Sequence, residues 1–159
     1  IARDLCLAVA HLHAQKPSPI LHRDIACRNL LVRADWSVVL SDYGLARRAN
    51  RGHYYDPTDN QSQLPVLWLP PEAIRGDVAY GPKGDVWQIG VALHEILNKG
   101  KKPYDHFLGP EHALIRLIAS GDIRLRIQTN DQTIADFINL CCSFDRKTRP
   151  TALQLIRDR

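Results

Sequence analysis

The feature that most constrains the fold of this chain is a long segment, residues 41–71, with neither helical nor strand periodicity. The segment is rich in Asn, Asp, Gly, Pro and Gln. Loops of this length are uncommon inside compact domains, and those that occur are usually functional or disordered. The flanking segments must therefore form the hydrophobic core, and their patterns predict how.

Those flanking segments predict a mainly α domain with one small β-hairpin. Apolar residues recur at helical spacing in residues 2–15, and prolines end the pattern. The runs 30–32 and 38–40, which are rich in strand-forming residues and separated by a turn, predict the hairpin. Gly84 and Gly90 indicate close packing in the next helical pattern. Helices are expected after the long loop at residues 82–100, 111–119, 133–142 and 151–158.

Composition narrows the classes of function. The chain has 159 residues, 45% of them apolar and 24% charged, which is enough for one globular domain. The net charge is +4 with Lys and Arg scattered, so we expect no nucleic-acid partner. No apolar run reaches membrane-spanning length. The four cysteines form no C-x-x-C pair, so we expect buried free thiols in a reducing, cytoplasmic compartment.

Residues 22–29, which read His-Arg-Asp-Ile-Ala-Cys-Arg-Asn, carry the chemistry. An Asp and an Asn in a polar loop are more often turn formers than a site. Here, however, the segment matches without a gap the catalytic loop H-R-D-x-x-x-x-N, so the chain resembles the protein kinase family. The resemblance implies that Asp24 orients the substrate hydroxyl and accepts its proton. It also implies that Asn29 holds Mg²⁺ against the phosphates of ATP.

Residues 41–44, Ser-Asp-Tyr-Gly, follow the second predicted strand and resemble the D-F-G motif of the same family. Asp42 would bind Mg²⁺ and contact ATP, since this cation prefers hard oxygen ligands. Gly44 would allow the backbone to turn. Tyr43 replaces Phe and adds a hydroxyl at a position expected to pack against apolar neighbours.

Residues 65–72, Pro-Val-Leu-Trp-Leu-Pro-Pro-Glu, resemble the tyrosine-kinase segment that forms the floor for the substrate tyrosine. The resemblance assigns substrate binding to Pro65 and Trp68. Leu67 stands where a basic residue is usual, and Pro70 where Ala is usual. The loss of that cation weakens the expected docking of a substrate.

Structural roles follow from the same resemblance. Glu72 is expected to form a buried ion pair with Arg149. Residues 84–91 resemble the family's S-D-V-W-S-F-G-V segment, in which the Asp, here Asp85, ties down the backbone of the His-Arg-Asp loop.

Other residues near the loop have expected places as well. Leu31 would form the apolar floor beneath the adenine of ATP. His22 is expected to pack and hydrogen-bond within the loop without transferring a proton. We expect His11 and His13 to lie on the surface of the first helix.

Two residues of the catalytic loop indicate the substrate class. Serine/threonine kinases usually place a Lys two residues after the catalytic Asp, where it contacts the γ-phosphate. That position is Ala26 here, and a cation comes instead at Arg28, which is similar to receptor-type tyrosine kinases. Arg28 would compensate charge near Asp24 and leave room for the longer phenol. A serine/threonine kinase is the less favoured alternative.

The resemblance covers residues 1–159 and implies the C-terminal lobe of the bilobal kinase fold, with an activation segment at about 42–72. The N-terminal lobe is absent, because no glycine-rich loop precedes Gly44 and Lys16 is the only lysine before Asp24. We therefore expect a fragment of a longer protein, with the missing N-lobe as its partner. By itself the chain is expected to be inactive.

Two interpretations of the longer protein stay open. In the first it is an active tyrosine kinase, cytoplasmic or on the cytoplasmic side of a membrane receptor, that transfers phosphate from ATP to a protein tyrosine. The intact Asp24, Asn29 and Asp42 favour it. In the second it is a pseudokinase that acts as a scaffold or interaction module, and Tyr43 and Leu67 keep that alternative open.

Tyr54 and Tyr55 resemble the tandem activation-loop tyrosines of insulin-receptor-like kinases and are expected sites of regulatory phosphorylation. A phosphate adds about −1.5 to −2 charges, which Arg23 together with Arg47 or Arg48 could pair with to order the loop.

Replacing both tyrosines by Phe removes the phosphate acceptors. We expect the full-length kinase to activate more slowly, as measured by the time course of peptide phosphorylation after ATP is added. An unchanged time course would remove the regulatory role.

Overall fold

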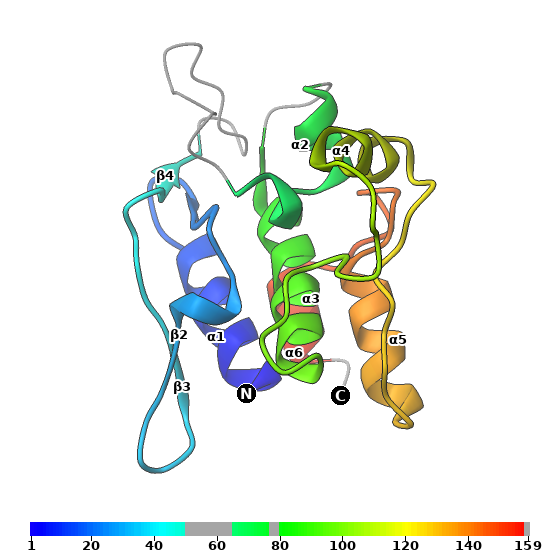
Figure 1. Cartoon of the computed structure of the whole chain (residues 1–159). Coiled ribbons are helices and arrows are strands. Elements are labelled where there is room, and N and C mark those ends of the chain that lie inside the picture. Colours follow the sequence, from blue (N-terminus) through cyan, green and yellow to red (C-terminus); the bar gives the residue numbers. More distant parts are fainter. Residues whose placement is uncertain (50–64, 77–79, 158–159) are drawn as a thin grey trace.

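One buried helix, α3 (Pro82–Leu97), runs through the middle of the fold (Figure 1). The computed structural model describes residues 1–49, 65–76 and 80–157. Tyr54 and Tyr55 lie outside these residues. The other helices are α1 (Ala2–His13), α2 (Pro71–Arg75), α4 (Glu111–Ser120), α5 (Gln132–Cys141) and α6 (Ala152–Arg157), with the 3-10 turns η1 (Cys27–Asn29) and η3 (Val66–Trp68). The strands are β1 (Ile20–Leu21), β2 (Leu30–Val32), β3 (Val38–Leu40) and β4 (Arg47–Arg48).

Helix α3 is buried on every side. It begins with Pro82, whose fixed φ suits the first helical position. All residues from Gly84 to Glu95 are buried, as expected of a helix that forms a core rather than covers one. A Cβ atom at Gly90 would lie 2.5 Å from the sulfur of Cys142, so this glycine allows α5 to approach closely. The close packing predicted from the glycines is therefore confirmed.

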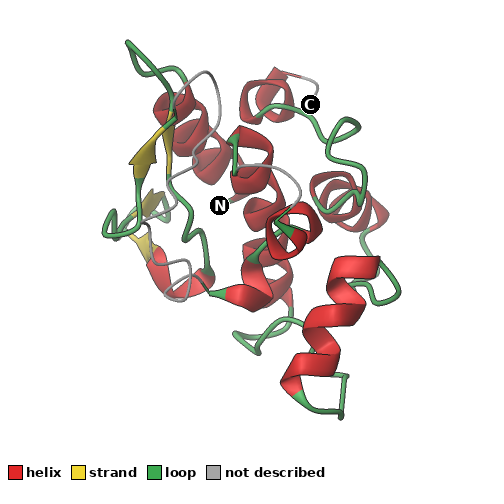
Figure 2. Cartoon of the chain, turned by 90° about the horizontal axis from the view of Figure 1, so that it is seen from above, coloured by secondary structure: helices red, strands yellow, loops and turns green. Residues whose placement is uncertain are grey.

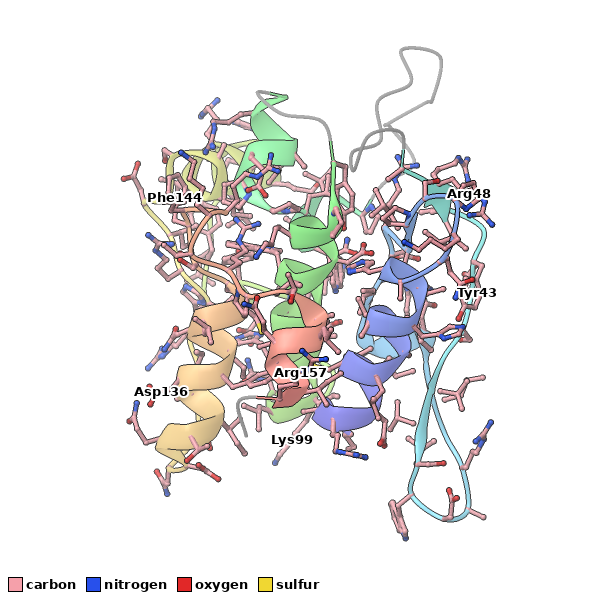
Figure 3. The ribbon with its side chains drawn as sticks, turned by 180° about the vertical axis from the view of Figure 1, so that it is seen from behind. Tyr43, Arg48, Lys99, Asp136, Phe144 and Arg157 are labelled. Carbon is pink, nitrogen blue, oxygen red and sulfur yellow. The ribbon has the colours of Figure 1, made fainter. Side chains whose placement is uncertain are left out.

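The main core lies where α1, α5 and α6 surround α3, and the strands lie along one side of this helical body (Figure 2). Figure 3 shows side chains filling the space between these helices, with Tyr43 and Phe144 on opposite sides of the body. The four cysteines, all within the described residues, form no disulfide, and burial raises the pKa of the Cys142 thiol to about 12. Within the described ranges, no helix has the length and apolar character needed to cross a membrane.

The predicted fold class, mainly α with a small β-hairpin, is confirmed. Strands β2 and β3 pair antiparallel, with Leu31 opposite Val39. A second two-stranded sheet was not predicted: β1 pairs antiparallel with β4, with Leu21 opposite Arg47. Arg48 strengthens this connection, because its guanidinium donates to the carbonyl oxygens of the turn after α1. The start of the long loop is thereby joined to the segment that leads into the catalytic loop.

The predicted ion pair between Glu72 and Arg149 forms in the interior. Arg149 Nη1 and Nη2 donate to the two carboxylate oxygens of Glu72 at 2.6 and 2.8 Å. Arg149 is 1% exposed, and its guanidinium also lies over the Trp87 ring, 4.9 Å from the centroid. This pair links α2 to the segment before α6.

Removing one partner leaves the other charge buried. We expect Glu72→Ala to lower the free energy of unfolding by about 3–5 kcal/mol, measured by urea denaturation. Asp136, an exposed carboxylate on α5 labelled in Figure 3, provides the control. Asp136→Ala should change stability by less than about 0.5 kcal/mol, and equal effects of both changes would contradict the assignment.

Among the described histidines, His22 and His94 are fully buried. Burial lowers the pKa of both below the usual value, although neighbouring hydrogen bonds and carboxylates partly oppose it. The folded chain thus binds fewer protons than the unfolded chain below about pH 6.5. The stabilisation from neutral histidine is complete above that pH and is lost as the pH falls.

The free energy of unfolding should therefore decrease between pH 7 and pH 5.5. His94→Gln removes one of the two contributions, so we expect a shallower slope, by up to about 1 kcal/mol per pH unit. The exposed His112 supplies the control, since His112→Gln should leave the slope unchanged. A His94→Gln slope equal to that of the unmodified chain would contradict this account.

Candidate active site

Asp85, near the start of α3, holds the catalytic loop. Its fully buried carboxylate accepts the backbone N–H groups of His22 and Arg23 at 2.9 and 3.0 Å. It also accepts the Tyr80 hydroxyl at 2.9 Å and His13 Nε2 at 2.8 Å. Burial by itself would raise the pKa of Asp85, but these hydrogen bonds hold it below its usual value. The predicted anchoring of the loop backbone is confirmed.

The prediction that His13 lies on the helix surface was wrong. Only 12% of its side chain is exposed, because the ring turns inward to Asp85. Its partner lies 72 residues away in sequence, so no local pattern could indicate this contact.

Two further residues of α3 hold the loop and were missed. Gln88 accepts the N–H of Ile25 at 3.1 Å and donates to the carbonyl of Arg23 at 3.0 Å. Glu95 accepts the N–H of Cys27 at 2.9 Å. Their spacing from Asp85 places all three on one helix face. Polar residues at helical spacing within an otherwise apolar helix were the signal that could have identified them.

The three residues predicted for catalysis lie together. Asp24 is 7% exposed, and one of its carboxylate oxygens is paired with the guanidinium of Arg28. The other accepts the side-chain N–H of Asn29 at 2.9 Å. Asn29 also donates to the carbonyl of Asp24 at 2.8 Å. The carboxylate is thus oriented from both sides, a requirement for a group that must meet a substrate hydroxyl.

The backbone is unusual at two of the predicted positions. Arg23 and Asp42 have positive φ angles of 70° and 61°, which are uncommon for residues with side chains. The turn at the D-Y-G motif therefore depends on Asp42 and not on the left-handed freedom expected of Gly44. Gly44 instead brings its N–H to 3.1 Å from the Asp42 carboxylate, where a Cβ would lie 3.2 Å from the same oxygen.

His22 and Tyr43 connect the loop to the D-Y-G motif. His22 Nε2 donates to the carbonyl of Ser41 at 3.1 Å, so the expected hydrogen bond is present. The two rings meet edge to face with centroids 5.0 Å apart. Tyr43 is 50% exposed and lies at the margin of the body in Figure 3, which corrects the expectation of a packed apolar position. The Tyr43 hydroxyl favours this partly exposed position, because a polar group loses less hydration there than in an apolar core.

The predicted arginine partners of a phosphate donate hydrogen bonds to backbone carbonyl oxygens. Arg23 is buried and donates to the carbonyl of Leu45. Arg47 donates to carbonyl oxygens of residues 44 and 46. Their pairing with a phosphorylated tyrosine stays a prediction.

Trp68, predicted to bind the substrate, lies beside the catalytic loop. Its indole N–H donates to Glu95 at 2.8 Å. The guanidinium of Arg28 lies over its ring, 5.0 Å from the centroid. Pro65 begins the same turn, because its carbonyl accepts the N–H of Trp68 at 2.9 Å. Leu31, expected beneath adenine, is 56% exposed on β2, so its side chain is accessible.

Asn29 and Asp42 offer the donors that Mg²⁺ prefers, an amide oxygen and a carboxylate. The amide nitrogen of Asn29 is engaged with Asp24, which leaves its oxygen available as a ligand. In the part of the chain that the structure describes, no group of three or more His, Cys, Asp and Glu side chains could hold a metal by itself. The binding of Mg²⁺ by Asn29 and Asp42 stays a prediction.

Comparison with known proteins agrees with this geometry. The model of the protein tyrosine and serine/threonine kinase family matches residues 1–158. A tyrosine-protein kinase receptor of Caenorhabditis elegans, old-1, is 31% identical over 144 residues, which is 87% of this chain and 28% of that protein. Fibroblast growth factor receptor homolog 2 of Drosophila melanogaster is 34% identical over 136 residues, or 86% of this chain and 13% of the receptor.

The insulin-like growth factor 1 receptor of Xenopus laevis is 28% identical over 156 residues, or 98% of this chain and 11% of the receptor. The chain thus spans 11% to 28% of the length of these relatives. The family model extends over nearly all of the chain, and the described helices and hairpin have the expected architecture of a kinase C-terminal lobe. The chain belongs to the protein tyrosine and serine/threonine kinase family.

Proposed function

We propose that residues 1–159 are the C-terminal lobe of a protein tyrosine kinase, which in its full-length form transfers the γ-phosphate of ATP to a protein tyrosine. The observation that carries the proposal is the arrangement of Asp24 between Arg28 and Asn29. The relative old-1 is a tyrosine-protein kinase receptor and supports the same substrate class.

Asp24 would accept the proton of the tyrosine hydroxyl as the phosphoryl group transfers. Arg28 would compensate the charge of Asp24. Serine/threonine kinases instead carry a lysine two residues after this Asp, where it contacts the γ-phosphate. The replacement of that lysine by Ala26, with the cation at Arg28 instead, would leave room for the longer phenol. Pro65 and Trp68 would form the floor on which the tyrosine rests.

ATP is the proposed second substrate, with Leu31 beneath its adenine. Mg²⁺ bound by Asn29 and Asp42 would neutralise charge on the phosphates. The activation segment is assigned to about 42–72, with Tyr54 and Tyr55 as its regulatory tyrosines.

The chain contains no glycine-rich loop before its catalytic loop, so we propose that transfer requires an N-terminal lobe of the longer protein. A site on the cytoplasmic side of a membrane would agree with the named receptor relatives. The roughly one hundred residues upstream should contain a glycine-rich loop and a Val-Ala-x-Lys strand. Their absence would favour the scaffold, to which the departures at Tyr43 and Leu67 also point.

Asp24→Asn keeps the shape of the side chain and removes the proton acceptor. In the full-length protein we expect phosphate transfer to a tyrosine peptide to fall by at least about 100-fold. The assay measures incorporation of labelled phosphate into otherwise identical peptides bearing Tyr or Ser. Asp136→Asn, on the exposed face of α5, is the matched control and should retain full activity.

Transfer by the Asp24→Asn protein at the unmodified rate would contradict the mechanism. Preference for the Ser peptide would contradict the substrate class. No transfer by the unmodified full-length protein would leave the scaffold as the function.

A further inference from the structure

The carboxylate of Glu95 connects two segments that lie far apart in the sequence. One oxygen, Oε2, accepts the backbone N–H of Cys27 at 2.9 Å and the indole N–H of Trp68 at 2.8 Å. Cys27 belongs to the catalytic loop, and Trp68 belongs to the predicted floor for the substrate. Glu95 itself is 5% exposed on α3. A single buried atom thus determines how these two segments lie relative to each other.

A second route leads from Glu95 to the catalytic carboxylate. The ring of Trp68, held by Glu95 at its N–H, lies beneath the guanidinium of Arg28. Arg28 in turn pairs with Asp24. Glu95 therefore reaches Asp24 through the backbone at Cys27 and also through the indole ring.

Val91 and Ala92, one turn earlier on the same face of the helix, are buried apolar residues. An apolar side chain at position 95 would avoid the cost of desolvating a carboxylate. What a carboxylate adds is a pair of charge-assisted hydrogen bonds, which are roughly twice as strong as neutral ones and more directional. The charge also lies near the Cys27 thiol, whose pKa is raised by burial first and by Glu95 second.

We propose that Glu95 is a positioning residue for the substrate tyrosine, because it holds the floor at Trp68 in a set place relative to Asp24. The inference rests on the proposed function, and it identifies a residue that sets where the substrate tyrosine lies relative to Asp24. Glu95 touches neither ATP nor the reacting hydroxyl in this account. Its loss should therefore affect the protein substrate and spare the nucleotide.

The experiment compares five variants of the full-length kinase by steady-state kinetics, varying a tyrosine peptide and ATP separately. Glu95→Leu removes the acceptor at similar volume, and we expect kcat/KM for the peptide to fall by roughly 10- to 100-fold. KM for ATP should stay within about twofold of the unmodified value, since no nucleotide contact changes. Glu95→Gln retains an oxygen acceptor and should restore most of the peptide activity.

Trp68→Phe keeps an aromatic ring and removes the N–H, so we expect a loss no larger than that of Glu95→Leu, which also breaks the contact with Cys27. The double variant should be no worse than Glu95→Leu alone, because Glu95→Leu already removes the contact that Trp68→Phe breaks. If Glu95→Leu does not fold, Trp68→Phe still tests the inference through the same comparison of peptide and ATP kinetics. Asp136→Asn is the surface carboxylate control and should leave both substrates unaffected.

Additive losses in the double variant, or equal losses toward peptide and ATP, would overturn the inference. So would a Glu95→Gln protein as impaired as Glu95→Leu. If the unmodified protein transfers no phosphate, the proposed function fails, and hydrogen exchange then tests the contact itself. Glu95→Leu should speed exchange at the Cys27 amide and spare that of His22, which Asp85 holds; unchanged exchange at Cys27 would overturn the contact.

Discussion

The rest of the structure depends on the buried carboxylate of Asp85. A charge inside a hydrophobic core is tolerated only when donors replace the water it has lost. Here the donors come from the end of α1, from the catalytic loop and from Tyr80 just before α3. Each of these segments must reach the same point for the carboxylate to be satisfied, so the interaction selects one arrangement of α1, the catalytic loop and the residues just before α3.

The catalytic loop has little regular secondary structure, and buried backbone N–H groups must still find acceptors. Side chains of α3 provide them: Asp85, Gln88 and Glu95 accept the N–H groups of residues 22, 23, 25 and 27. The loop is thus shaped by a neighbouring helix and not by its own sequence preferences. This explains how Arg23 keeps a left-handed backbone, which would be unfavourable in isolation.

Periodicity and spacing allowed part of this structure to be predicted. The long helices and the β2–β3 hairpin follow from local patterns, and the grouping of Asp24, Arg28 and Asn29 follows from an uninterrupted motif. The β1–β4 pairing and the contact of His13 with Asp85 join residues distant in sequence, so no local pattern contained them. The positive φ at Asp42 was also missed, because a glycine two residues later offered the simpler explanation. The regulatory role of Tyr54 and Tyr55 stays a prediction.

The distance along α3 between Asp85 and Glu95 also constrains the length of the catalytic loop. Asp85 and Glu95 are ten residues apart, which corresponds to about 15 Å along a helix that rises 1.5 Å per residue. The loop runs from His22 to Cys27 between the N–H groups that these two carboxylates accept. Adding one residue to either segment would shift the donors out of register with the acceptors, and on the helix it would also rotate every later acceptor by about 100°. The spacing of the acceptors on the helix and the length of the loop are therefore constrained together.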